Sequence, residues 1–280
     1  MSQLNAPRAL VTGCSSGIGQ ALVSALLDTG YEVIATVRRD EDKATLERLG
    51  ATVVLLDVTD KDGIDALIAS LGDSAASKAR GLDLLINNAG FGAMGPVLDF
   101  EAKALRDQFE TNVFAPILLA KACLPLLRTA RGVMVNIGSV AGEVSSPYGG
   151  VYCASKAALH RLNDAMRMEL APLGVDVILV RPGAIESRFG KRARSELAAR
   201  QSSHSAWQAY KKGIDRRAAS SELLSSTPAS TLAARLIKAL KKRRRPALIR
   251  VGNGGVLLPL MVAVPARLRD WVFRRYFGLR

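Results

Sequence analysis

Short apolar runs alternate with longer segments whose apolar residues recur every three or four positions, from Arg8 almost to the end of the chain. Short runs of this kind predict buried strands, and the longer periodicity predicts helices packed against them. The expected strands are 8–12, 32–37, 52–56, 82–87, 132–137, 175–180 and 247–251. The expected helices begin near Gly17, Glu41, Lys61, Ala102, Tyr152 and Thr227. Repeated strand-helix-strand units predict an α/β fold, a doubly wound parallel sheet covered by helices on both faces.

Two segments fall outside this alternation. The segment 186–226 is polar, helical and rich in arginine and lysine, and we expect it to form a lid over a site at the sheet edge. The segment 253–280 begins with an apolar run too short to span a bilayer and then turns basic and aromatic. It suits either a helix packed on the domain or an anchor at a membrane interface. We therefore expect one domain over 1–252, followed by a C-terminal extension over 253–280.

Charge adds a preference for anionic partners. The 280 residues carry a formal net charge of +14, which would attract phosphorylated cofactors, an anionic membrane surface or nucleic acid. The densest basic run, 241–245, follows an apolar helical segment, and a solvated helix end accounts for it, with contact to anionic lipid as the alternative. Charge alone does not choose among these partners.

The cysteines and histidines indicate neither a disulfide framework nor a metal site. The three cysteines include no Cys-x-x-Cys pair, and the two histidines lie in no His-Glu-x-x-His motif. The first residues also lack the pattern of a signal peptide. These features favour the reducing cytoplasm, with membrane association through the extension as a further option.

The first expected strand runs directly into a glycine-rich turn, Thr12-Gly13-Cys14-Ser15-Ser16-Gly17-Ile18-Gly19. Its glycines would let the backbone turn sharply and approach a pyrophosphate, whose charge suits the N-terminus of the following helix. The expected contacts are Gly13, Ser15, Ser16, Gly17, Ile18 and Gly19. The alternative is a turn that only joins strand to helix.

The second expected strand ends at Arg38-Arg39, where a protein that prefers NAD usually carries an acidic side chain. Guanidinium groups there could instead pair with a 2′-phosphate. The sequence therefore favours NADP(H) over NAD(H), unless both arginines are ordinary surface cations.

Polar residues also end the third and fourth strands. Asp57, followed by Val58, would reach the same sheet edge and could accept a hydrogen bond from an adenine amino group. Asn87 and Asn88 precede Ala89-Gly90, and amides at the end of a buried strand need partners. Neighbouring loop backbone and a bound cofactor are equally good candidates for those partners.

Ser139 follows the fifth strand, and thirteen positions later Tyr152 and Lys156 lie four apart on one helix. An ammonium beside a phenol favours the phenolate and brings proton transfer closer to neutral pH. Ser139 could donate to a substrate oxygen and hold a carbonyl where a hydride can reach its carbon.

The four motifs Thr12–Gly19, Asn87–Gly90, Ser139 and Tyr152–Lys156 together resemble the short-chain dehydrogenase/reductase family over about residues 8–252. The resemblance implies a Rossmann-type domain and a nicotinamide cofactor. It also implies that Tyr152 is the general acid/base, Ser139 the substrate stabiliser and Lys156 a ligand of the nicotinamide ribose.

By the same resemblance, Asn112 would hold a water that relays protons to Lys156, and the loop after the sixth strand would lie beside the carboxamide. Ser187 stands in that loop where a threonine is commoner, and Ser16 stands where many NADP(H) members carry a basic residue. The cofactor contacts expected beyond the glycine-rich turn are Arg38, Asp57, Val58, Asn88, Ala89, Gly90, Tyr152, Lys156, Pro182, Gly183, Ile185 and Ser187.

Within the family, the glycine-rich turn, the end of the second strand and the tail look most similar to members that act on steroids, retinoids or lipid-linked ketones. The expected function is therefore NADP(H)-dependent interconversion of an alcohol and a ketone or aldehyde on a lipophilic small molecule. No nucleic-acid partner is expected, and a homo-oligomer is an option. The side chains that could line an apolar pocket, or simply pack, are Phe91, Met94, Val140, Val144, Phe189 and Trp207.

Two other functions are compatible with parts of the sequence. Gly13–Gly17 also matches Gly-x-Ser-x-Gly, which would make Ser15 an esterase nucleophile with His160 as its base. Against this, His160 lies in the helix of Tyr152 and Lys156. The second alternative is a nonenzymatic NADP(H)-binding regulator, and the complete Ser, Tyr and Lys set argues against it.

Overall fold

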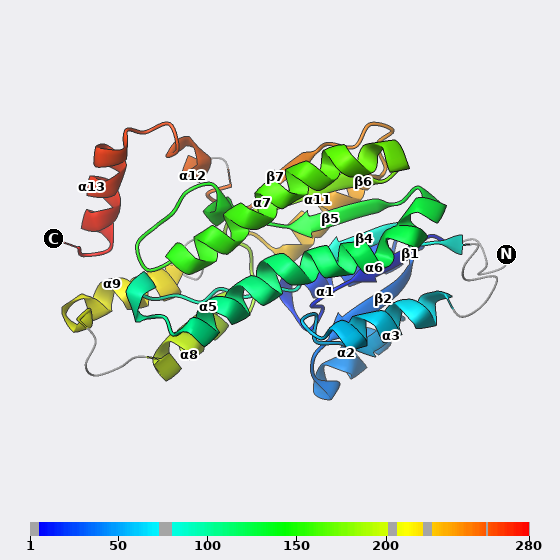
Figure 1. Cartoon of the computed structure of the whole chain (residues 1–280), viewed down its shortest axis with the longest axis horizontal. Helices are drawn as coiled ribbons and strands as arrows, with labels where there is room; N and C mark the ends of the chain where they lie inside the picture. The colour runs from blue at the N-terminus through cyan, green and yellow to red at the C-terminus, as the bar shows by residue number, and fades with distance from the viewer. Residues whose placement is uncertain (1–5, 73–79, 201–205, 221–225, 256, 280) are drawn as a thin grey trace.

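The computed structural model describes residues 6–72, 80–200, 206–220, 226–255 and 257–279. Within them seven parallel strands form one sheet in the order β3-β2-β1-β4-β5-β6-β7, and Figure 1 labels all of them except β3. The strands are β1 (Arg8–Val11), β2 (Glu32–Val37), β3 (Thr52–Leu55), β4 (Leu84–Asn87), β5 (Val133–Ile137), β6 (Asp176–Pro182) and β7 (Leu248–Val251). This confirms the expected doubly wound α/β fold.

Helices cover both faces of the sheet. The helices that alternate with the strands are α1 (Gly17–Leu27), α2 (Lys43–Glu47), α3 (Lys61–Gly72), α5 (Ala102–Phe109), α6 (Ala115–Ala130), α7 (Gly150–Leu170) and α11 (Ala229–Leu240). Helices α1 and α11 pack on one face, and α3, α6 and α7 pack on the other. Beyond the carboxyl ends of the strands lie α8 (Phe189–Arg200), α9 (Lys211–Ala218), α12 (Leu257–Leu260) and α13 (Ala266–Tyr276).

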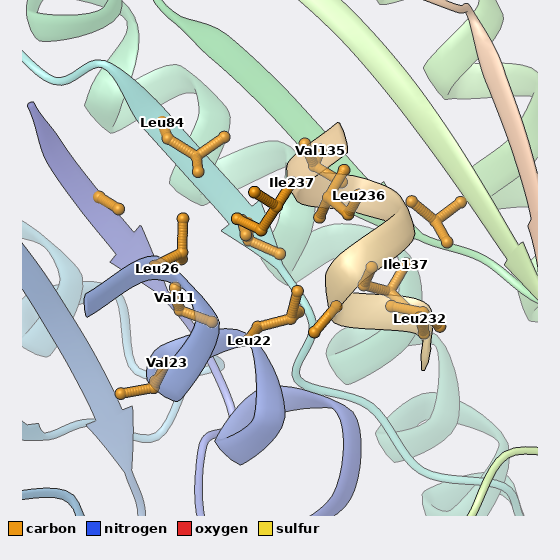
Figure 2. Close-up of a cluster of buried hydrophobic side chains, with 14 of the residues drawn as sticks. Val11, Leu22, Val23, Leu26, Leu84, Val135, Ile137, Leu232, Leu236 and Ile237 are labelled. Atoms are coloured by element: carbon orange, nitrogen blue, oxygen red, sulfur yellow. The ribbon is translucent and has the colours of Figure 1, made fainter. Parts of the chain in front are cut away.

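The buried strands explain the continuous apolar runs of the sequence. Successive side chains of a strand point to opposite faces of the sheet, so Ala9 and Val11 join the core under α1 and α11, whereas Leu10 joins the core on the other face. Figure 2 shows the first of these cores, in which Leu22 and Leu26 of α1 lie against side chains of α11 and the sheet. Both faces of the sheet therefore require apolar residues.

Element boundaries differ from the expected ones by a few residues. Strand β4 begins at Leu84 rather than Leu82, and the second helix begins at Lys43, after a 3-10 turn over Asp40–Asp42. Helix α7 begins at Gly150, so Tyr152 lies in its first turn. The segment expected to be a lid contains α8 and α9, and its residues 201–205 and 221–225 lie outside the described residues.

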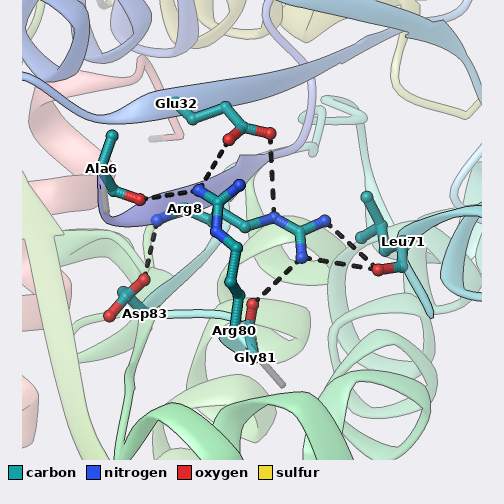
Figure 3. A network of polar contacts seen from close by, with 7 residues as sticks. All are labelled: Ala6, Arg8, Glu32, Leu71, Arg80, Gly81 and Asp83. Atoms are coloured by element: carbon teal, nitrogen blue, oxygen red, sulfur yellow. Dashed lines mark hydrogen bonds and ion pairs between the residues drawn. The ribbon is translucent and has the colours of Figure 1, made fainter. Parts of the chain in front are cut away.

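A polar network ties the amino ends of the strands together, opposite the edge that carries the site (Figure 3). The buried Arg8 donates to the carbonyl oxygens of Leu71 and Gly81, at 3.4 and 3.3 Å. Arg80 forms a 2.8 Å ion pair with Glu32 and also donates to the backbone. A buried guanidinium must be paired to be tolerated, so this network is structural.

One helical run in the described residues, Ala102–Ala130, has the length and apolar composition of a membrane-crossing helix. Its side chains Leu119, Cys123 and Leu127 are buried in the core beside α3 and the sheet. Packing within the fold therefore accounts for the apolar character of this run.

Candidate active site

A cavity of about 1160 Å³ lies at the carboxyl edge of the sheet, where the loops of parallel strands converge. Most residues expected from the sequence line it, namely Gly13, Ser15, Ser16, Ile18, Gly19, Arg38, Asp57, Val58, Asn88, Ala89, Gly90, Ser139, Tyr152, Lys156, Pro182, Gly183, Ile185 and Ser187. Gly17 and Asn112 are not among the residues that line it. The tertiary structure thus brings the two expected ends of the site, the glycine-rich turn and the Ser, Tyr and Lys set, into one space.

Close packing explains the glycines of the turn. Gly13 has φ +70°, and a Cβ there would lie 2.7 Å from the Cα of Ala89. A Cβ on Gly19 would lie 2.4 Å from the carbonyl oxygen of Gly13, and one on Gly17 would lie 2.7 Å from the Cβ of Ser187. Any side chain at these positions would push the turn away from the sheet edge, so the spacing is specific to this packing.

The two asparagines after β4 find their partners within the protein. Asn88 donates from its amide to the carbonyl oxygens of Thr12 and Gly13, both at 2.9 Å. Asn87 donates to Oδ1 of Asn136 at 2.8 Å, and Asn136 in turn donates to Asn163 at 2.9 Å. The sequence left open whether these amides bond to the protein itself or to a cofactor, and in the structure they bond to the protein. Asn88 thereby holds the glycine-rich turn at the cavity wall.

Tyr152 and Lys156 both lie buried at the cavity, one helical turn apart on α7. Burial raises the pKa of the Tyr152 phenol to about 12, whereas a hydrogen bond with Ser139 and the charge of Arg217 act to lower it. Lys156 Nζ donates to the carbonyl oxygen of Ile137 at 2.9 Å, and burial lowers its pKa to about 8.

The sequence predicted that Lys156 would bring the phenol's pKa down, and in this structure the net shift is upward. The physical reason is that both groups are removed from water, which disfavours the charged form of each. At neutral pH the phenol is protonated with or without this shift and can act as a proton donor.

Ser139 lies at the end of β5 with extended backbone, and its hydroxyl accepts a hydrogen bond from Ala141 N at 3.1 Å. His160 stands directly behind it, with Nε2 accepting from Ser139 N at 3.3 Å. A Cβ on Gly138 or Gly142 would lie 2.4 Å from the imidazole, so the ring is sandwiched between these glycines. His160 thus supports the Ser139 loop, and the structure does not favour its use as an esterase base.

Asn112 occupies a π-helical turn, Glu110–Phe114, between α5 and α6. Its fully buried amide accepts from Phe91 N at 3.1 Å and donates to Phe91 O and Ser155 Oγ at 2.9 and 3.1 Å. A Cβ on Gly90 would lie 3.0 Å from Asn112 Oδ1 and 3.5 Å from Lys156 Nζ. Gly90 therefore lies against both side chains, and the proton relay through Asn112 stays a prediction.

At the far end of the cavity, charged residues follow the ends of β2 and β3. Arg39 is ion-paired with Glu41 and Asp42, at 2.8 and 3.1 Å, whereas Arg38 forms no ion pair with any residue that the structure describes. Burial acts to raise the pKa of Asp57, but hydrogen bonds from Thr59 and the charges of Arg38 and Arg192 outweigh it and lower the pKa. Arg38 therefore presents an available cation to the cavity.

Helix α8 and the C-terminal extension contribute an apolar wall to the cavity. The Phe189 ring lies 5.3 Å from that of Tyr152, and Phe277 lies 6.3 Å from Tyr148. Of the apolar residues expected at a pocket, Phe91, Met94, Val140, Val144 and Phe189 line the cavity, whereas Trp207 packs on Tyr148. The extension adds Leu258, Met261, Val272, Phe273, Tyr276 and Phe277. It therefore packs on the domain, one of the two roles that the sequence left open, and its share in the cavity was not expected from the sequence.

Comparison with known proteins agrees with this geometry. A family model described as short chain dehydrogenase matches residues 7–198. The chain is 35% identical over 272 residues to the short-chain dehydrogenase ptmH of Penicillium ochrochloron, covering 96% of this chain and 97% of that protein. It is also 35% identical over 195 residues to the NADPH-dependent 3-dehydrocapnine reductase of Ornithobacterium rhinotracheale, covering 67% and 68%.

Solved structures show the same fold. A short-chain dehydrogenase from Streptomyces avermitilis superposes with a TM-score of 0.80 at 31% identity, and the match covers 96% of each chain. Two Burkholderia proteins share the fold at lower identity. The one from B. cenocepacia was solved with NADP (TM-score 0.74, 24% identity, 97% and 99% covered), and the one from B. phymatum with NAD (TM-score 0.77, 23% identity, 98% and 97% covered).

Proposed function

We propose that this chain reduces a lipophilic ketone or aldehyde with NADPH. The chain belongs to the short-chain dehydrogenase family and is thus an oxidoreductase of alcohol and carbonyl groups. The observation that carries the proposal is the meeting of Ser139, Tyr152 and Lys156 in one cavity, between a glycine-rich turn and an apolar wall. The family membership makes a nonenzymatic regulator or a serine esterase the weaker alternative.

The residues at the glycine-rich end fit a nicotinamide dinucleotide. The N-terminus of α1 and the backbone of the turn would hold the pyrophosphate, and Arg38 would pair with a 2′-phosphate. Asp57 would accept from the adenine, Lys156 would bind the nicotinamide ribose, and the loop 182–187 would lie beside the carboxamide. When bound, NADPH supplies the hydride. Because Arg38 lines the cavity and forms no ion pair within the described residues, NADPH is favoured over NADH.

The chain's own residues would hold the carbonyl and supply the proton. Ser139 Oγ would donate a hydrogen bond to the carbonyl oxygen and orient it. Tyr152 Oη is protonated at neutral pH, and burial raises its pKa further to about 12, so it would transfer its proton to that oxygen. A protonated phenol suits reduction of a carbonyl better than oxidation of an alcohol, which needs a base.

The apolar wall supports a lipophilic substrate of the steroid, retinoid or lipid-like kind. Phe189, Phe273 and Phe277 come from the lid and the extension and enclose the side of the cavity beyond Tyr152. Burial of an alkyl chain against such side chains is favourable by about 0.8 kcal/mol per methylene. The relative named as a 3-dehydrocapnine reductase is NADPH-dependent, which is in line with this choice of cofactor.

We further propose that the outer face of α13 binds an anionic membrane surface. Leu268 and Trp271 are spaced i and i+3, so they share a face of α13, and both are exposed. Arg267 and Arg274 flank them. A second copy of the chain is a poorer partner, because the segment 254–280 carries five arginines and one aspartate and two such surfaces repel each other. Apolar and aromatic residues beside arginines are typical of interfacial helices.

The test of the proposed reaction is an NADPH-consumption screen over ketones and aldehydes, including a series of 2-alkanones of increasing chain length, repeated with NADH. We expect turnover with NADPH whose kcat/KM rises with chain length until the cavity is filled. NADPH binding without turnover on any carbonyl compound would favour the regulator instead. A kcat/KM that does not depend on chain length would remove the lipophilic substrate class.

A further inference from the structure

Arg217 reaches the catalytic cavity from the lid helix α9, and neither the sequence motifs nor the proposed reaction accounts for it. Arg217 is among the residues that line the cavity. Nε donates to Ser146 Oγ at 2.8 Å, and one terminal nitrogen donates to Ser220 Oγ at 2.9 Å. A Cβ on Gly149 would lie 2.6 Å from the other terminal nitrogen. The side chain is therefore held in place just before α7, about one helical turn ahead of Tyr152.

The partners of this guanidinium are neutral. Arg181 and Arg250 share Glu143, and Arg192 pairs with Glu196. Among the residues that the structure describes, no carboxylate forms an ion pair with Arg217. Within the described residues the hydrogen-bond partners of this half-buried cation are hydroxyl groups, and burial of a cation is costly unless an anion joins it. Two of the guanidinium's five donors bond to residues that the structure describes, and the others can serve such an anion.

The charge of Arg217 also acts at the reacting group. It is close enough to lower the pKa of Tyr152, against the larger effect of burial. An anion bound by Arg217 would therefore lie close to a carbonyl held at Tyr152 and Ser139. The Phe189 ring packs on Tyr152 at 5.3 Å, and Phe273 and Phe277 continue this apolar surface.

We propose that Arg217 binds an anionic group of the substrate, a carboxylate, sulfonate or phosphate within a few bonds of the carbonyl, while an alkyl chain lies along Phe189, Phe273 and Phe277. The substrate class is thus an anionic amphiphile with a carbonyl near its head group. The inference rests on the proposed carbonyl reduction and narrows its substrate. Arg217 determines specificity because a guanidinium matches planar or tetrahedral oxyanions through paired N–H donors.

Binding of unreactive amphiphiles tests Arg217 without any need for turnover. The probes are dodecanoate, dodecyl sulfonate and dodecyl phosphate, with dodecanol as the neutral partner, each added to the NADPH-loaded protein below its micelle concentration and followed by calorimetry. Arg217→Gln should weaken the anionic probes about tenfold to a hundredfold and leave dodecanol within about twofold. Comparison of the three head groups identifies the preferred anion.

Lys212→Gln is the matched control, because it removes an exposed cation from the same helix outside the cavity. We expect it to leave all four affinities unchanged. Equal weakening by both variants would show a general charge effect and overturn the proposal. Equal weakening of anionic and neutral probes by Arg217→Gln would show that Arg217 only links α9 to the Ser146 loop. That result would also overturn the proposal.

Turnover provides a second measurement. For a 3-oxo fatty acid and its methyl ester, Arg217→Gln should raise KM for the acid about tenfold or more with little effect on KM for the ester. Any effect through the pKa of Tyr152 would change kcat for both substrates equally, so the difference between them isolates recognition of the anion. Absence of turnover on every carbonyl, with the binding difference intact, would refute the proposed reaction and not the anion site.

Discussion

The imidazole of His160 supports the backbone of Ser139, with Nε2 accepting the Ser139 N–H at 3.3 Å. The ring must be neutral at Nε2 to accept this bond. Burial, followed by the charges of Arg181, Lys156 and Arg161, lowers the pKa of His160 to about 3. A residue placed only 21 positions beyond the serine thus fixes the turn that presents the serine hydroxyl to the cavity.

This relationship predicts an acid-sensitive contribution to stability. The pKa of His160 in the folded state, about 3, lies below the value of about 6.5 expected in the unfolded chain. Between these values the unfolded state binds the extra proton, so stability falls as pH drops from about 6.5 towards 3. His160→Gln, which keeps an acceptor but cannot titrate, should flatten this part of the curve of Tm against pH.

The matched variant His160→Leu removes the acceptor as well. It should also flatten the curve, and it should lower kcat by about tenfold while His160→Gln retains most of it, because only Leu leaves Ser139 N without a partner. Identical pH curves for the wild type and His160→Gln would contradict the assignment.

Tyr152→Phe should abolish most turnover and keep cofactor binding. The change removes the transferable proton but keeps the ring against Phe189, and loss of a general acid costs about a hundredfold to ten-thousandfold in kcat. The control is Tyr148→Phe, because the buried Tyr148 hydroxyl has no hydrogen-bond partner among the described residues and should be dispensable. Steady-state kcat and NADPH titration measure the two effects. Near-normal turnover in Tyr152→Phe would remove this residue from the chemistry.

Arg38→Ala should weaken NADPH and spare NADH. A guanidinium pair with the 2′-phosphate is a charge-assisted interaction, so its loss should raise the NADPH dissociation constant about tenfold to a hundredfold. Arg39→Ala should have a smaller effect, because Glu41 and Asp42 already neutralise that cation. Fluorescence titration with both cofactors measures the change. An equal loss for NADPH and NADH in Arg38→Ala would show that this residue does not bind the phosphate.

Docking of α13 on lipid can be followed through Trp271, because the chain has only two tryptophans and Trp207→Phe leaves Trp271 alone. Its emission should shift to shorter wavelength with vesicles that contain anionic lipid, and not with purely zwitterionic vesicles. Each arginine near such a surface contributes about 1 kcal/mol. The double variant Arg267→Ala and Arg274→Ala should therefore weaken binding about thirtyfold.

The comparison variant for this experiment carries Lys241→Ala and Lys242→Ala, from the exposed basic run after α11. It removes the same charge from another part of the molecule and should bind vesicles almost as the wild type does. If both double variants lose affinity equally, net charge and not α13 drives the association.

The fold and the cofactor end of the site were predictable because their signals are local. Apolar periodicity distinguishes strand from helix, and parallel strands necessarily bring their carboxyl ends to one edge. Residues at those ends, such as Ser15, Arg38 and Asp57, therefore had to meet there. The four-residue spacing of Tyr152 and Lys156 likewise places both on one helix face, whatever surrounds the helix.

The rest of the site depends on contacts between distant segments. In the sequence, His160 is a helical residue without an evident partner, and its contact with Ser139 forms only when α7 packs on the loop after β5. Arg217 becomes part of the cavity because α9 packs on Ser146, 71 positions earlier. Phe273 and Phe277 close the apolar wall from the far end of the chain. No periodicity encodes such contacts.

By itself, then, the sequence determined the order of strands and helices, the glycine-rich turn and the Ser, Tyr and Lys set, since each follows from spacing along the backbone. Tertiary structure alone decided the electrostatics and the shape of the cavity. It raised the pKa of Tyr152 through burial, where spacing had suggested the reverse, and it brought an arginine and an aromatic wall to the phenol. Burial and long-range packing are properties of the assembled fold, and they set the protonation state and the space that a substrate meets.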